Sequence, residues 1–179
     1  MEELSLHILD IAKNSVKAKA NNITIKINED EKDNRLTIEI IDDGCGMSEE
    51  FLKTVKNPFS TTRTTRKVGM GISLFEAAAI QCGGGLEISS KLGEGTTVKA
   101  DFELNSIDRA PLGDIAGTMT ALISGSPEID FVYSHNKNGN EFKLDTKEIR
   151  EILGDVPLDN LDVVSWIDGF INDGLKEIQ

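Results

Sequence analysis

The sequence predicts an α+β fold, namely a two-layer α/β sandwich of helices on a mixed, mainly antiparallel sheet, with a small α/β extension at the C-terminal end. Helical hydrophobic patterns alternate with pairs of short strands that each have one apolar face. That order places helices on one face of an antiparallel sheet. Near Asn105 a second series of helices and strands begins. We therefore expect two parts, residues 1–105 and residues 106–179.

The elements of the first part follow from two periodicities. Apolar residues recur at steps of three and four in helices and alternate with polar residues in strands. Ser48 is a suitable N-cap for a short helix, and Gly69 is expected to open a longer one. Residues 59–68 have no usable period and predict a loop. Helices are predicted over about 3–18, 49–56 and 69–81, and strands over 23–27, 36–40, 86–90 and 96–104.

The second part has elements of its own. We expect it to pack on the first part and to offer a surface to a partner. His135, in the turn between its two strands, is expected to be exposed, whereas Trp166 on the last helix is expected in the core. The predicted helices cover about 112–123, 146–153 and 160–178, and the predicted strands cover 129–134 and 141–144.

Charge and composition exclude several classes of partner. The net charge is −12, which argues against nucleic acid. Residues 106–179 hold 14 acidic and 6 basic residues, a net of −8, so the remaining −4 belongs to residues 1–105. No apolar run approaches the roughly 20 residues of a membrane span. Two cysteines do not indicate a disulfide framework, so we expect a cytoplasmic protein, with its oligomeric state left open.

One segment is basic although the protein is acidic. Between Lys53 and Lys67 there are five basic residues and no acidic one. Such a segment suits closure over an anion, and a solvated loop is the alternative interpretation.

Two positions on the first helix can act on a water or a magnesium ion. Asp10 and Asn14 are four residues apart, so their side chains lie one above the other on one helix face. A carboxylate and an amide so placed can hold or activate a water, or hold a magnesium ion. A solvated helix flank is the alternative.

The stretch IDDGCGM, residues 41–47, leaves a strand as a bare loop. Asp42 at the strand end can accept a hydrogen bond from the amino group of a flat heterocycle. Gly44 and Gly46 would leave space for the ring and permit unusual backbone angles. A simple turn has the same composition.

Two further stretches complete the set. Gly69-Met70-Gly71 at a helix start would offer backbone amides to a phosphate. Thr96, in GEGTTV, enters the last strand of the first part. Neither stretch is specific alone.

Taken in order, these stretches resemble the ATP-binding domain of the gyrase, heat-shock chaperone, histidine kinase and mismatch-repair superfamily, called the GHKL or Bergerat fold. The resemblance covers about residues 4–104. It implies ATP as the ligand and Mg²⁺ as its accompanying ion. The matching stretches are the N box LDIAKNSVKAKA, the first glycine box IDDGCGM, the lid entry PFSTTR, the second glycine box KVGMGISL and the GT motif GEGTTV.

The resemblance also implies a role for each matching residue. Asp42 would accept the adenine amino hydrogen bond, and Thr96 would join the water network around the ring. Asn14 would coordinate magnesium between the phosphates, with Lys17 nearby. The other expected binding residues are Gly44, Gly46 and Met47 at the ring, Phe59, Thr61, Thr62 and Lys67 in the lid, and Gly69, Met70 and Gly71 at the phosphates.

One departure from the family pattern bears on activity. Where ATP-hydrolysing members carry glutamate and many histidine kinases carry asparagine, this chain has Asp10, which would be the catalytic base for water or a protein hydroxyl. His7 is expected to be structural, so a phosphate acceptor would be on another chain. We expect a Mg²⁺-dependent ATP-binding phosphotransferase acting on a partner protein. A slow ATPase switch and a non-catalytic nucleotide sensor are the alternatives.

Overall fold

The computed structural model describes residues 3–56 and 66–179, and the side chains of residues 3–55 and 71–179. Its strands form one six-stranded sheet in the order β3-β4-β2-β1-β5-β6. Only the pair of β1 and β5 is parallel, so the prediction of a mixed, mainly antiparallel sheet is confirmed. The strands are β1 (Asn22–Asp30), β2 (Arg35–Asp42), β3 (Gly85–Lys91), β4 (Gly95–Glu103), β5 (Asp130–Lys137) and β6 (Asn140–Asp145).

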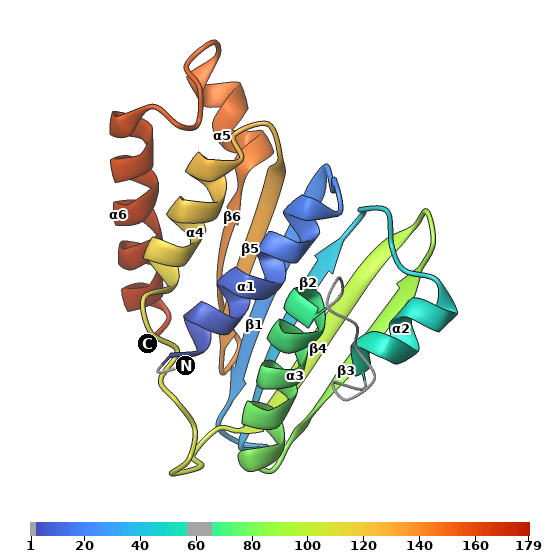
Figure 1. Cartoon of the computed structure of the whole chain (residues 1–179). Coiled ribbons are helices and arrows are strands. Elements are labelled where there is room, and N and C mark those ends of the chain that lie inside the picture. Colours follow the sequence, from blue (N-terminus) through green and yellow to red (C-terminus); the bar gives the residue numbers. More distant parts are fainter. Residues whose placement is uncertain (1–2, 57–65) are drawn as a thin grey trace.

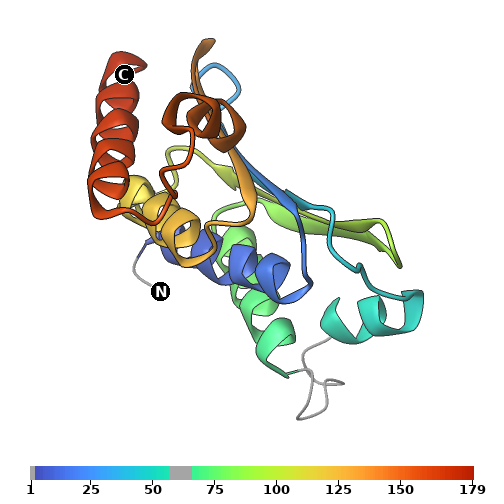
Figure 2. The same cartoon turned by 90° about the horizontal axis from the view of Figure 1, so that it is seen from above.

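The helices form a second layer. In Figures 1 and 2, α3, α1, α4 and α6 lie in that order across one face of the twisted sheet, and α2 lies at the far end beside α3. The described helices are α1 (Leu4–Lys17), α2 (Glu49–Lys56), α3 (Arg66–Gln81), α4 (Ile115–Gly125), α5 (Thr146–Leu153) and α6 (Leu161–Glu177). None of them is long and apolar enough to cross a lipid bilayer.

The core lies between the two layers. Ile23, Ile25 and Ile27 of β1 alternate toward the helices and are buried, as the strand period predicts. The opposite face of the sheet is polar. Across four adjacent strands it places opposite charges side by side, in the row Lys26, Glu39, Lys99 and Glu87. Such cross-strand pairs stabilise a face that water reaches.

Residues 106–179 continue the sheet of the first part. β5 pairs with β1 along its whole length, and β6 forms the outer edge. The buried hydrophobic residues of both parts belong to one cluster. The boundary near residue 105 stays a prediction, and the chain on its two sides shares a sheet and a core.

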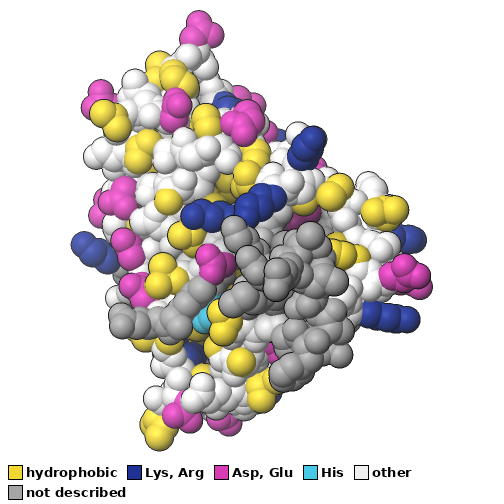
Figure 3. Space-filling model, viewed as in Figure 1, with side chains coloured by type: hydrophobic (Ala, Val, Ile, Leu, Met, Phe, Trp, Pro, Cys, Tyr) yellow, Lys and Arg dark blue, Asp and Glu magenta, His cyan; other side chains and the backbone are white. Residues whose placement is uncertain are grey.

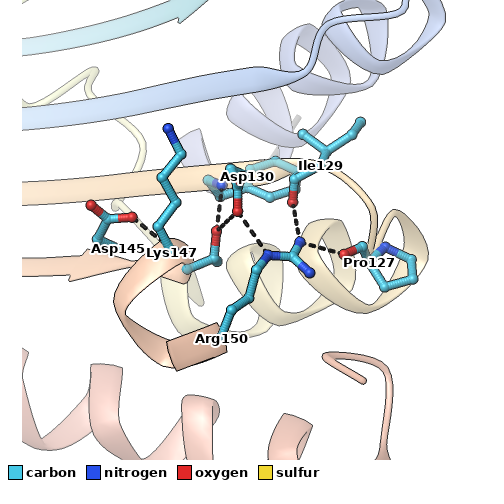
Figure 4. Close-up of polar contacts among 8 residues, drawn as sticks. Pro127, Ile129, Asp130, Asp145, Lys147 and Arg150 are labelled. Atoms are coloured by element: carbon cyan, nitrogen blue, oxygen red, sulfur yellow. Dashed lines mark hydrogen bonds and ion pairs between the residues drawn. The ribbon is translucent and has the colours of Figure 1, made fainter. Parts of the chain in front are cut away.

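Polar contacts fix α5 to the start of β5 (Figure 4). The side chain of Asp145 caps the first turn of α5. The guanidinium of Arg150 donates to Oδ1 of Asp130 at 2.8 Å and to the carbonyl of Ile129 at 3.1 Å, and it also contacts the carbonyl of Pro127. One arginine therefore satisfies three acceptors where the chain turns from α4 into β5.

The start of α3 differs from the sequence prediction. The helix begins at Arg66 and not at Gly69. No glycine or proline between Arg66 and Val68 opposes helical backbone, so the helix extends toward its N-terminus. Gly69 is consequently the fourth residue of α3 and Gly71 the sixth. Only Gly69 is among the first four residues, whose amides lack a partner within a helix.

Candidate functional site

A cavity of about 240 Å³ opens where the ends of α1, β2 and β4 meet. Most of its wall is hydrophobic, and a few polar side chains converge on it, which is the usual composition of a small-molecule site. The polar residues come from three different elements. Its lining residues are Ile11, Asn14, Ser15, Lys17, Ala18, Ile40, Asp42, Cys45, Gly46, Met47, Phe51, Ile72, Thr96 and Val98.

The carboxylate of Asp42 is held from two sides. The hydroxyl of Ser15 on α1 donates to Oδ2 at 2.6 Å, and the amide of Gly44 donates to Oδ1 at 2.8 Å. Each oxygen can accept a further hydrogen bond, because an ionised carboxylate has about four acceptor positions. Asp42 therefore presents a fixed acceptor to the cavity.

The loop after β2 is packed tightly on its neighbours. The amide of Cys45 donates to the carbonyl of Ala18 at 2.9 Å, and the carbonyl of Cys45 accepts from Gly93 at 2.7 Å. A Cβ on Gly44 would lie 2.8 Å from that of Ala18. Gly46 has a φ of 70°, and a Cβ there would overlap the carbonyl of Lys91. Gly44 thus leaves space for the end of α1, and Gly46 leaves space for the β3–β4 turn and also lines the cavity. Their expected role in leaving space for a ring stays a prediction.

Asp43, beside Asp42, has a different role. Its carboxylate accepts from the amides of Asn21 and Asn22 at 2.8 and 2.9 Å, outside the cavity. Partial burial raises the pKa of the Asp43 carboxyl, but the hydrogen bonds from Asn22 and Asn21 lower it more, so its pKa lies below the usual value. Asp43 therefore ties the loop to the start of β1.

Ser90 connects the loop to the opposite strand pair. Its hydroxyl accepts from the amide of Met47 at 2.8 Å, donates to the carbonyl of Gly95 at 3.0 Å and lies 2.8 Å from the hydroxyl of Thr96. Sequence analysis did not select Ser15 or Ser90. Strand pairing places Ser90 opposite Thr96, so the predicted hairpin contained a signal for it.

Asp10 and Asn14, the two expected site residues four positions apart, lie on α1 and face Gly71 of α3. A Cβ on Gly71 would lie 4.0 Å from the Cβ of Asp10 and 4.0 Å from Nδ2 of Asn14. Asn14 also lines the cavity. Gly71 of the second glycine stretch therefore lies beside Asp10 and Asn14 of the first helix.

The structure thus gathers most of the expected residues. Asn14, Lys17, Asp42, Gly46, Met47 and Thr96 line the cavity, and Gly44 and Gly71 contact residues that line it. Phe59, Thr61 and Thr62 lie outside the described residues. Lys67, Gly69 and Met70 belong to α3, and their side chains are not among those described. Asp10 lies next to the cavity and is not in its wall.

His7 is buried between α1 and α3. Its ring stacks on Phe75 with centroids 5.1 Å apart, and its Nδ1 has no hydrogen-bond partner. Burial lowers the pKa of His7, so the ring is neutral near pH 7. The expected structural role of His7 agrees with this burial.

Comparison with known proteins identifies the family. The family model described as histidine kinase-, DNA gyrase B-, and HSP90-like ATPase matches residues 2–106, more than half of the chain. The chain belongs to this family. It therefore carries an ATP-binding domain of the GHKL type.

Curated relatives of this GHKL protein include two kinases. It is 29% identical over 91 residues to sporulation kinase D of Bacillus subtilis, and this match covers 51% of this chain and 18% of that protein. It is 32% identical over 95 residues to histidine protein kinase DivJ of Caulobacter vibrioides, which covers 51% of this chain and 16% of that protein. The chain thus spans less than a fifth of the length of these relatives.

A solved structure extends the likeness beyond the family match. The Aquifex aeolicus MutL ATPase domain complexed with ADP has a TM-score of 0.50 and 16% identity to this GHKL protein. The likeness covers 86% of this chain and 69% of that chain. It concerns the fold alone, and it confirms the α+β class.

Proposed function

We propose that the cavity binds the adenine of ATP, with Asp42 as the acceptor for its amino group. The hydrophobic walls suit a flat ring, and the only described carboxylate in the lining is that of Asp42. The bonds from Ser15 and Gly44 fix this carboxylate before the ligand arrives. Pre-organisation of this kind reduces the entropic cost of binding.

The phosphates would extend from the ring toward Asn14 and Lys17. Both residues line the cavity on the α1 side, and Asn14 offers one amide oxygen. Among the described residues no group of three acidic, histidine or cysteine side chains could hold a metal. This donor set fits Mg²⁺, which usually keeps several waters and binds through few protein ligands together with phosphate oxygens. A bound Mg²⁺ would supply charge neutralisation at the phosphates.

We propose further that the protein transfers the γ-phosphoryl group to a partner protein. The bond between the γ-phosphorus and the oxygen that bridges it to the β-phosphate would break, a bond from the γ-phosphorus to an acceptor oxygen or nitrogen would form, and ADP would leave with the bridging oxygen. Asp10, which faces Gly71 beside Asn14, would accept the proton of the attacking group. The kinase relatives support transfer over hydrolysis, and the single observation that carries ATP binding is the fixed acceptor at Asp42.

The test is incubation of the purified chain, with and without cytosolic extract of its source, in the presence of γ-labelled ATP and Mg²⁺. Label that becomes attached to protein is the expected result. Release of the label as free phosphate, without labelling of protein, would indicate a hydrolase. Retention of the label in ATP would indicate a nucleotide sensor.

The Asp10→Asn variant separates chemistry from binding. It should abolish labelling and leave ATP affinity within about twofold, because it removes the base and not the adenine contacts. The matched control is Asp33→Asn in the exposed β1–β2 turn, which should label normally. Full activity of Asp10→Asn would show that Asp10 is not the base.

A further inference from the structure

The outer face of α6 exposes two large aromatic side chains. Trp166 is 52% exposed and Phe170 is 39% exposed, although we expected Trp166 in the core. The buried face of α6 is already complete with Val163, Ile167 and Ile171. The packing of α6 on the core therefore does not require the indole of Trp166.

The aromatic pair is packed against the core. The rings of Trp166 and Phe170 stack with centroids 5.0 Å apart and an angle of 8° between their planes. Phe170 packs in turn on Phe142 of β6 at 5.3 Å, and Phe142 packs on the buried Tyr133. One face of the indole is covered by Phe170, and the exposed aromatic surface is held in place by the core.

Carboxylates bracket the aromatic pair along the helix. Asp162 lies one turn before Trp166, and Asp173 and Glu177 lie two and three turns after it, all exposed. Their spacings from Trp166 are four, seven and eleven residues, which places them on the same side of the helix. We call these three acids, Trp166, Gly169 and Phe170 the α6 stripe. Acidic and hydrophobic side chains are interspersed over α6 in Figure 3.

Gly169 leaves an open position within the stripe, which we call the notch. Gly169 precedes Phe170 and lies one turn after Trp166. A Cβ added to it would meet no atom within 4 Å. Glycine in the middle of a helix lowers helix stability relative to alanine. The structure offers no packing reason for this glycine, and the missing side chain leaves room beside the indole.

We propose that the α6 stripe is a docking surface for a basic amphipathic helix of a partner protein. An apolar side chain of that helix would enter the notch at Gly169. Arginine or lysine side chains would cover the indole of Trp166 and pair with Asp162 and Asp173, since cations bind favourably to both aromatic faces and carboxylates. The net charge of −8 on residues 106–179 would attract such a partner.

A second copy of this chain is the less suitable occupant. Two α6 stripes placed face to face would bring the carboxylates of Asp162, Asp173 and Glu177 against their own copies. Like charges in contact oppose association. The charge of the stripe therefore favours a cationic helix.

The chain has a single tryptophan, which gives the test a direct signal. The probe is a synthetic peptide of about 20 residues that contains no tryptophan and carries a stripe of leucine flanked by arginine on one helical face. We expect the peptide to shift the emission of Trp166 saturably and to bind more weakly as salt rises. A control peptide with glutamate in place of every arginine should not bind.

Variants locate the binding, measured by the anisotropy of a labelled arginine peptide. Gly169→Gln fills the notch, replaces a helix-weakening residue and should leave the fold intact while lowering affinity at least tenfold. Asp162→Lys should do the same through charge. Glu151→Lys on α5 makes the same change of net charge elsewhere and should bind like the unmodified protein.

Several results would overturn the proposal. Equally tight binding of the arginine and glutamate peptides contradicts it, and so does binding of the arginine peptide by Gly169→Gln as tightly as by the unmodified protein. So do a loss of affinity in Glu151→Lys as large as that in Asp162→Lys, and the absence of any shift in Trp166 emission at every peptide concentration. Concentration-dependent self-association that Trp166→Ala removes, with no effect of the arginine peptide, would assign the stripe to a second copy.

Discussion

In the proposed function, recognition of adenine depends on Asp42, which lines the cavity. Its carboxylate accepts hydrogen bonds from the hydroxyl of Ser15 and the amide of Gly44. These bonds orient the carboxylate without any ligand. An acceptor that is already oriented discriminates between rings that carry an amino group at the matching position and rings that do not. Selection of adenine over guanine is therefore expected to reside in this one side chain.

Replacing Asp42 with asparagine tests that assignment. We expect ATP affinity to fall by roughly ten- to a hundredfold, because hydrogen bonds to charged groups contribute about 1.5–3 kcal/mol. The control is Asp43→Asn, whose side chain lies outside the cavity on Asn21 and Asn22. Titration of both variants with ATP by calorimetry gives the comparison, and equal affinities would remove Asp42 from the adenine site.

If Asp42 binds adenine as proposed, the hydroxyl of Ser15 should affect ATP binding through Asp42. Ser15→Ala removes the 2.6 Å bond to Oδ2 and should weaken ATP binding about two- to tenfold, the effect of one ordinary hydrogen bond. The double variant with Asp42→Asn should be little worse than Asp42→Asn alone, because the two side chains act as a unit. Additive losses in that double-mutant cycle would mean that Ser15 meets the nucleotide directly.

At the scale of elements, the loop between β2 and α2 owes its position to close contact with other backbone. Gly46 has a left-handed φ and lies against the carbonyl of Lys91. Gly93, in the turn that receives this loop, also has a left-handed φ, but a Cβ there would meet open space. A side chain at either position would have backbone strain, but only a side chain at Gly46 would also overlap the carbonyl of Lys91. Comparing the two positions therefore separates the two costs.

Gly46→Ala and Gly93→Ala should accordingly differ in their effect. Gly93→Ala is expected to lower the free energy of unfolding by about 1 kcal/mol, the cost of a left-handed non-glycine residue. Gly46→Ala should cost distinctly more and should weaken ATP binding as well, because the loop must shift away from Lys91. Urea denaturation of the two variants measures this, and equal costs would contradict the packing explanation.

The contacts of Arg150 allow a prediction about the stability of residues 106–179. Arg150→Lys keeps the charge but cannot reach Asp130, Ile129 and Pro127 together. We expect a fall of about 2–6 °C in the melting temperature, which corresponds to about 1–2 kcal/mol in a chain of this size. Thermal unfolding followed by circular dichroism is the measurement, with Lys143→Arg on the exposed side of β6 as a control.

The elements were predictable where a local period determines them. Helix and strand spacing located the helices and strands described, whereas the start of α3 had no such signal. His135 was assigned to an exposed turn, yet it is 3% exposed. The alternation of Phe131, Tyr133 and His135 continues through β5, and the turn-like composition of HNKNGN concealed it. Trp166 was assigned to the core because its helix is amphipathic, but it lies 100° from the buried Ile167.

At the scale of the whole molecule, a buried polar chain joins the two parts. The hydroxyl of Tyr133 lies 2.7 Å from Nδ1 of His135, whose Nε2 lies 2.7 Å from the carboxylate of Glu29 on β1. The hydrogen bond from His135 lowers the pKa of Glu29, and the nearby charges of Lys137 and Arg109 add to this in spite of partial burial. Burial raises the pKa of Tyr133. Sequence analysis had no local signal for this contact between distant strands.

The lowered pKa of Glu29 predicts sensitivity to acid. A carboxyl whose pKa is lower in the folded state contributes stability above its unfolded pKa, near 4.5, and this stability is lost as pH falls through the folded value. Glu29→Gln should therefore be less stable than the unmodified protein at pH 7, and the difference should shrink below about pH 4.5. Urea denaturation from pH 7 to pH 3 measures both, and a constant difference across this range would contradict the linkage.

The parallel pairing of β5 with β1 also determines the order in which the chain can fold. Partners such as Asn22 and Asp130 are more than a hundred residues apart in sequence, so one side of β1 has no neighbour until the ribosome has released β5. Bare strand edges invite pairing with other chains, and contacts of high sequence separation form late. Pulsed hydrogen exchange during refolding should therefore show protection of β2 and β4 before β5, and nascent chains that stop short of β5 should aggregate.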